Sequence, residues 1–166
     1  MTSNRMRFLL ACLLTGGLLI SPAHAVKMGD KFTDWVVACE QPDEDVPELC
    51  HIFQNLALKE GGARVLHVQV GFIPNQTHPV AIFTLPLGVA LPPGVQMKVD
   101  EHEPVNFPIE VCVQDGCRAG LELTPDRLEM MKKGDKANVT FANVQRQGLT
   151  VPVSLAGFTA GVNALR

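Results

Sequence analysis

Hydrophobic and polar positions alternate along most of the chain, in short segments separated by glycine and proline. Residues 34–38, 49–58 and 64–73 carry apolar side chains at every second position, the period of a strand with one buried face. Residues 80–85 are apolar on both faces, which predicts an interior strand. The following segment, LPLGVALPPG at 85–94, contains too many prolines and glycines for a regular helix.

The strand pattern continues in the second half of the chain. Residues 95–99 alternate, and residues 137–144 and 149–155 predict a hairpin. Pro152 within the last segment predicts an edge strand, because proline has no N–H for a ladder hydrogen bond.

Two short helices are predicted. Thr124-Pro125-Asp126 supplies an N-cap, a first-turn proline and an early acid, and Gly134 can end that helix. Residues 156–165 form a second, weaker helical segment with two glycines. Strands spaced by about ten residues with this little helix predict a single all-β domain, either a sandwich or an open barrel.

The first 25 residues have the three regions of a secretory signal peptide. Arg5 and Arg7 precede an apolar run at 8–20, and Ala23-His24-Ala25 is a small-x-small cleavage site. The run is too short for a comfortable bilayer span, and no later stretch reaches that length without charges or prolines. We therefore expect residues 26–166 to be one exported domain without a transmembrane segment.

The charge of the expected mature chain excludes two classes of partner. It carries 12 basic and 17 acidic residues, a net charge of −5. Nucleic-acid binding requires a basic surface to neutralise phosphates, and docking to an anionic membrane requires a polybasic segment. The sequence therefore argues against both.

Four cysteines remain after the expected cleavage: Cys39, Cys50, Cys112 and Cys117. An even number in an exported domain indicates two disulfides, with three possible connectivities. Neither spacing is the C-x-x-C of a redox catalyst, and the gap between the first two is too long for a zinc knuckle.

Local geometry favours pairing each cysteine with its sequence neighbour. Residues 107–113 and 118–123 have strand patterns around Gln114-Asp115-Gly116, so a four-residue loop at 113–116 would place Cys112 opposite Cys117. Pairing the other two would close the acidic loop at 41–48. Each local bridge would stabilise the fold by roughly 2–3 kcal/mol, and crossed pairing by slightly more, so energetics leave both schemes open.

The residues needed for common catalytic mechanisms are scarce. Ser154 is the one serine after residue 25, its surroundings are not G-x-S-x-G, and the chain has no tyrosine. The histidines are scattered, at His51, His67, His78 and His102. We therefore predict a non-enzymatic protein without a cofactor.

Two acidic clusters are candidates for metal sites. Residues 100–103 (DEHE) hold the densest set of ligands, but neighbouring residues on a strand point to opposite faces. Residues 43–45 (DED) lack the spaced oxygens of a calcium loop. Solvated turns are the favoured interpretation of both, so no metal is expected. Trp35 could anchor a partner, although a core position is favoured.

Several motifs together resemble one known family. They are W-x-x-x-C at 35–39, C-x-I-x-Q at 50–54, LPLGVALPPGVQM at 85–97, C-x-x-x-G-C at 112–117 and PVSLAGFTAGV at 152–162. In order and spacing the chain is similar to the invasion-associated locus B family of Gram-negative envelope proteins. The resemblance implies an exported, β-rich domain with no established catalytic residue, cofactor or ligand. It assigns structural positions only: the four cysteines, Trp35 and Gly157-Phe158.

These features together predict a protein that binds another protein at the bacterial envelope or on a host surface. Its location would be the periplasm or the outer surface of a Gram-negative cell. The alternative is a periplasmic accessory or assembly factor without host contact. Polar loops on a disulfide-stapled scaffold, at 41–48, 74–79 and 100–106, are the expected contact regions. Their candidate residues are Asp43, Glu44, Asp45, Asn75, His78, Glu101, His102 and Glu103.

Overall fold

Two antiparallel sheets make up most of the protein in the computed structural model, which describes residues 26–41, 45, 47–57 and 62–166. The larger sheet has the order β1-β2-β3-β4-β5-β9-β8, and the smaller β11-β10-β6-β7. In chain order the elements are β1 (Lys31–Phe32), β2 (Trp35–Glu40), β3 (Leu49–Ala57), β4 (Arg64–Gly71), β5 (Val80–Leu85), β6 (Val95–Val99), β7 (Val105–Phe107), β8 (Val111–Val113), β9 (Gly116–Glu122), α1 (Pro125–Lys133), β10 (Lys136–Ala142), β11 (Gly148–Ser154) and α2 (Phe158–Ala164).

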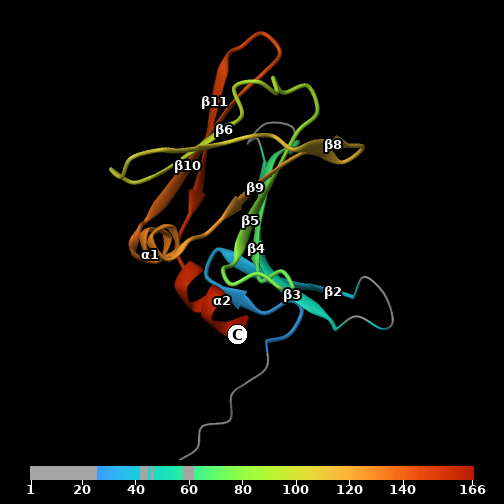
Figure 1. Ribbon diagram of the computed structural model, residues 1–166, viewed down its shortest axis with the longest axis vertical. Coiled ribbons are helices and arrows are strands. Elements are labelled where there is room, and N and C mark those ends of the chain that lie inside the picture. Colours follow the sequence, from blue (N-terminus) through green and yellow to red (C-terminus); the bar gives the residue numbers. More distant parts are fainter. Residues whose placement is uncertain (1–25, 42–44, 46, 58–61) are drawn as a thin grey trace, which may run out of the picture.

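The two sheets bury their facing sides in a shared core. Phe83 of the larger sheet and Phe107 of the smaller contact each other with ring centroids 5.2 Å apart, and both are buried. Figure 1 shows the smaller sheet and the two helices on one side of the larger sheet. The two sheets have separate strand orders with free edges. The predicted all-β fold is thus confirmed, as the sandwich of the two alternatives.

One row of side chains shows how the alternating pattern builds this core. Val37, Ile52, Val70, Ala81 and Leu121 are register partners across five neighbouring strands, and all five are buried. Since side chains alternate along a strand, their sequence neighbours lie on the opposite face. We call that opposite side of the seven-stranded sheet the outer face.

The end of the chain completes the core beneath β2 and β3. The Trp35 indole N–H donates to the Ser154 carbonyl oxygen at 3.1 Å, and the Gln54 amide donates to the same oxygen at 2.7 Å. The Trp35 ring also meets Phe158 of α2 edge-on, at 5.3 Å between centroids. Trp35 is fully buried, so its predicted core position is confirmed.

Both disulfides join sequence neighbours. Cys39 and Cys50 are register partners on β2 and β3, and Cys112 and Cys117 are partners on β8 and β9. The local pairing is confirmed and the crossed scheme is wrong.

The predicted strand at 107–113 is wrong in one respect. Phe107 ends β7 in the smaller sheet, and the chain crosses to begin β8 at Val111 in the larger one. Pro108, which cannot donate to a ladder, follows the buried Phe107 at the crossing. The loop of the stapled hairpin is also shorter than predicted, because Val113 pairs with Gly116 and leaves only Gln114 and Asp115 between them.

The remaining predicted elements are found at their expected places. α1 has Pro125 in its first turn and ends before Gly134, although the Thr124 side chain makes no capping hydrogen bond. β10 and β11 form the predicted hairpin, and Pro152 lies on the edge strand β11. α2 lies within the second predicted helix.

No helix in the described part of the chain is long and apolar enough to cross a membrane. The predicted signal peptide at 1–25 lies outside the described residues, as do the candidate contacts Asp43 and Glu44.

We expect Gly157→Ala to lower the free energy of unfolding sharply. Gly157 has φ +85°, and an added Cβ would overlap the Phe32 carbonyl oxygen. Gly88, at φ +86° with nothing within 4 Å of an added Cβ, is the matched control. Gly88→Ala should cost about 1–2 kcal/mol from backbone strain alone, and Gly157→Ala at least about 1 kcal/mol more from overpacking. Equal losses in urea unfolding would contradict the packing assigned to Gly157.

Candidate functional site

The structure brings two of the three candidate contact loops to the same end of the larger sheet. Glu40 pairs with Leu49, the two strand ends that flank the 41–48 loop. Gly71 pairs with both His51 and Val80, so the 72–79 loop follows at the same end. Of the candidate residues there, Asp45 and Asn75 are exposed and His78 is half-buried.

The third candidate region lies elsewhere, in the turn between β6 and β7. Glu101, His102 and Glu103 are exposed there, and the last two line a depression beside α1. The neighbouring Asp100 carboxylate accepts hydrogen bonds from the backbone N–H groups of Asp135 and Lys136, at 2.9 and 3.1 Å. That carboxylate is thus committed to holding the turn against the start of β10.

A groove on the outer face connects the two loops that do come together. Its deeper part is a hollow of 140 Å³, bordered by Glu40 and Leu49 on one side and by Phe72 on the other. A wider, shallower part of 510 Å³ continues toward Glu110 and Glu122. The two parts share Ile73, Val80 and Ile82, and together we call them the outer groove.

Two glycines account for the depth of the outer groove. Gly71 pairs with His51, and a Cβ there would lie 2.9 Å from the His51 Cβ. At Gly120 a Cβ would lie 3.2 Å from the Glu110 carboxylate. Neighbouring side chains therefore lean over both glycines, and the half-buried Ile82 between them forms an apolar floor.

The charged side chains that line the outer groove are all acidic. They are Glu40, Glu110 and Glu122, each exposed. Glu122 lies 2.8 Å from the His78 imidazole, which fixes the 72–79 loop to β9. Carboxylates around an apolar floor favour a partner that is both apolar and positively charged.

A short stack of rings crosses the outer face beside the groove. Phe53 lies between His51 and His67, with ring centroids 6.3 and 5.5 Å away. His67 Nδ1 lies 2.8 Å from an Asn55 amide oxygen, and Nε2 lies 3.1 Å from a Gln69 amide oxygen. A neutral ring donates through only one nitrogen, so one of these amides must turn its NH₂ group toward a neutral His67.

Burial lowers the pKa of both histidines below the ordinary value of 6.5. For His51 the loss of hydration dominates, opposed by the Glu40 carboxylate and reinforced by His67. For His67 burial again dominates and lowers the pKa, opposed first by the hydrogen bond to Gln69. Both rings are thus neutral in the folded protein at neutral pH.

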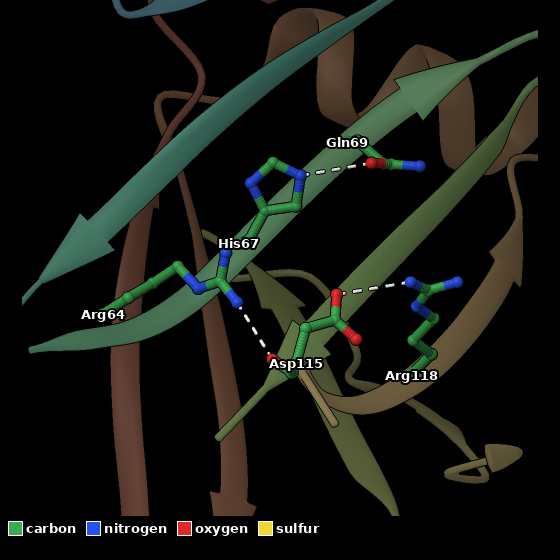
Figure 2. A network of polar contacts seen from close by, with 5 residues as sticks. All are labelled: Arg64, His67, Gln69, Asp115 and Arg118. Atoms are coloured by element: carbon green, nitrogen blue, oxygen red, sulfur yellow. Dashed lines mark hydrogen bonds and ion pairs between the residues drawn. The ribbon is translucent and has the colours of Figure 1, made fainter. Parts of the chain in front are cut away.

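The far end of the outer face carries a polar network instead of a groove. Arg64 donates to the Asp115 carbonyl oxygen at 3.0 Å, and Arg118 pairs with the Asp115 carboxylate at 3.3 Å. Figure 2 shows these side chains together with His67 and Gln69. Arg64 and Arg118 therefore lie at one end of the outer face, and the acidic groove lies at the other.

The chemistry available for a metal is limited in the described residues. One group of potential ligands lies close together there, Cys39, Glu48 and Cys50. Its two sulfurs are bonded to each other, so they are not the thiolates that a metal requires. The expectation that no metal is bound stays a prediction.

Comparison with known proteins decides the family. The family model described as invasion associated locus B (IalB) protein matches residues 35–166. The chain belongs to the invasion-associated locus B family. The predicted resemblance is therefore confirmed, and the matched region begins at Trp35.

Three proteins with a similar sequence or fold are each at most 23% identical to this chain. Invasion protein B homologs from two strains of Brucella abortus are each 23% identical over 146 residues, covering 87% of this chain and 83% of theirs. The crystal structure of invasion associated protein B from Bartonella henselae superposes with a TM-score of 0.71 at 18% identity, covering 84% of this chain and 95% of that one. This likeness shows that the fold is shared.

The outer groove was not predicted from the sequence. Candidate contacts were chosen as polar loop residues, whereas the floor is made by Val80 and Ile82 on β5. The signal was present, because residues 80–85 are apolar on both faces. That pattern was assigned to burial on both sides, but Val80 and Ile82 are only half-buried. β5 is interior within its sheet, as predicted, and open on its outer side.

We expect the stability of the protein to fall as the pH drops from about 7 to about 5.5. The unfolded chain takes up protons on His51 and His67 near the ordinary pKa of 6.5, whereas the folded protein resists protonation. The stabilisation is therefore complete above the unfolded pKa and is lost as the pH falls through it.

The double variant His51→Gln/His67→Gln should flatten this pH dependence. Urea unfolding across the same pH range, on the variant and the parent protein, measures the effect. If the two slopes are identical, the burial assigned to these rings is wrong.

Proposed function

We propose that this member of the invasion-associated locus B family is an exported, non-enzymatic envelope protein that acts by binding another protein. The observation that carries the proposal is the outer groove, an apolar-floored hollow on a sheet face that neither helix nor the smaller sheet covers. Solvated faces of antiparallel sheets are normally polar. An apolar hollow at such a face is typical of a recognition site.

The two disulfides support the exported part of the proposal. Such bonds persist in oxidising compartments such as the periplasm and the cell surface. Both bridges tie neighbouring strands of the larger sheet, so they stiffen the sheet that carries the groove. The contact surface that we propose consists of the outer groove together with Asp45, Asn75 and His78, which lie in the two loops at that end of the sheet.

The alternative, an assembly factor that adds a partner's strand to a sheet edge, has weaker support. The edge strands β1, β7 and β8 have two, three and three residues. The longest edge strand, β11, contains Pro152. Short edges and proline both oppose pairing with another strand. The exposed Val111 and Val113 on β8 are the features that keep this alternative open.

A triple replacement at the groove end, Asp45→Ala/Asn75→Ala/His78→Ala, should abolish capture of a partner by the exported protein. The matched control, Glu101→Ala/His102→Ala/Glu103→Ala, changes equally polar residues in the β6–β7 turn and should capture the partner normally. The measurement is affinity capture from opened envelopes, with identification of the bound protein. Protease treatment of intact cells, beside a periplasmic control protein, then tells a surface location from a periplasmic one.

Two results would contradict the proposal. One is a captured partner that both triple variants retain in full. The other is turnover of a substrate by the purified protein at a rate that the triple replacement at the groove end changes, because this would indicate an enzyme.

A further inference from the structure

We propose that the outer groove binds an extended, cationic polypeptide segment in which an aliphatic or aromatic side chain enters the hollow and adjacent lysines or arginines meet the surrounding carboxylates. This inference rests on the proposed function and adds the chemistry of the partner to it. It uses only the described residues of the groove and not the 41–48 loop.

The size of the hollow fits a single side chain. Its 140 Å³ is close to the roughly 150 Å³ of an apolar cavity that holds a benzene-sized molecule. Val80 and Ile82 form its floor, and Ile73 at its rim is 39% exposed. Covering these aliphatic groups would remove apolar surface from water, which is the main driving force for a contact of this kind.

The charges around the groove favour a partner with positive charge. Glu40 borders the hollow, while Glu110 and Glu122 border the shallower part, and no lysine or arginine lines either part among the described residues. The whole chain is acidic as well, with a formal net charge of −3. A cationic segment would be drawn toward the groove, and an acidic one would be repelled.

Two of the protein's own arginines lie next to residues that line the groove. The Arg166 guanidinium lies over the Phe72 ring at 5.2 Å from its centroid, and Phe72 lines the hollow. Arg127 donates to the Glu122 carbonyl oxygen at 3.0 Å. These contacts engage the Phe72 ring and a backbone carbonyl, so a partner's lysine or arginine would meet the Glu40, Glu110 and Glu122 carboxylates instead.

The test uses the exported, disulfide-bonded protein and three labelled synthetic peptides of equal length, followed by fluorescence anisotropy. The first alternates leucine with lysine, the second leucine with glutamate and the third glycine with lysine. We expect saturable binding of the leucine–lysine peptide and at least about tenfold weaker binding of each of the others, because one loses the charge match and the other the apolar contact.

Variants of the protein locate the binding. Glu110→Gln/Glu122→Gln keeps the shape of the groove and should weaken binding of the leucine–lysine peptide roughly three- to tenfold. The remaining affinity should depend less on salt concentration. The matched control Glu101→Gln/Glu103→Gln removes the same charge from the β6–β7 turn and should bind as the parent does.

The inference is overturned if both double variants bind the peptide equally, if the leucine–glutamate peptide binds as well as the leucine–lysine peptide, or if none of the three peptides shows saturable binding. In each case a partner captured through the groove-end loops would leave the proposed function standing. If the parent protein captured no partner, the proposed function would be contradicted whatever the peptides do.

Discussion

The Ser154 carbonyl oxygen is the point on which the arrangement of the layers depends. It accepts hydrogen bonds from Trp35 and Gln54, on the second and third strands of the larger sheet, although it belongs to the last strand of the smaller one. This contact joins β2 and β3 to the C-terminal segment, whose helix α2 packs against the Trp35 ring. Because the C-terminal segment packs against the inner side of the larger sheet, it does not cover the outer face.

The open outer face is a second constraint, because its side chains must interact well with water and also hold the sheet in shape. Arg64, Asp115 and Arg118 form a polar network at one end, and the ring stack of His51, Phe53 and His67 lies in the middle. At the other end the surface is apolar over Val80 and Ile82 and ringed by carboxylates. We place the contact surface at this end, where aliphatic side chains form the floor between the polar groups.

Alternation and turn chemistry were enough to predict the strands, both disulfides and the core position of Trp35, because these depend on local spacing. The crossing at Pro108 could not be predicted, because the strand pattern runs through it without a break. The two parts belong to different sheets only because Phe107 packs against Phe83, which is a tertiary contact. The outer groove could not be predicted for a related reason. Its depth depends on Gly71 and Gly120, which the register across the sheet places on the same face, on either side of β5. Apolar residues on both faces of β5 predict burial on both sides, but Val80 and Ile82 are only half-buried.

Photo-crosslinking in living cells tests most directly whether the outer face is the contact surface. A photoreactive residue would replace Ile73 at the groove rim, 39% exposed, or Leu149 on the smaller sheet, 40% exposed. Equal exposure makes random collisions comparable at the two positions. We expect a discrete protein adduct from position 73 and none from position 149. An adduct from position 149 alone would contradict it and place the contact on the smaller sheet.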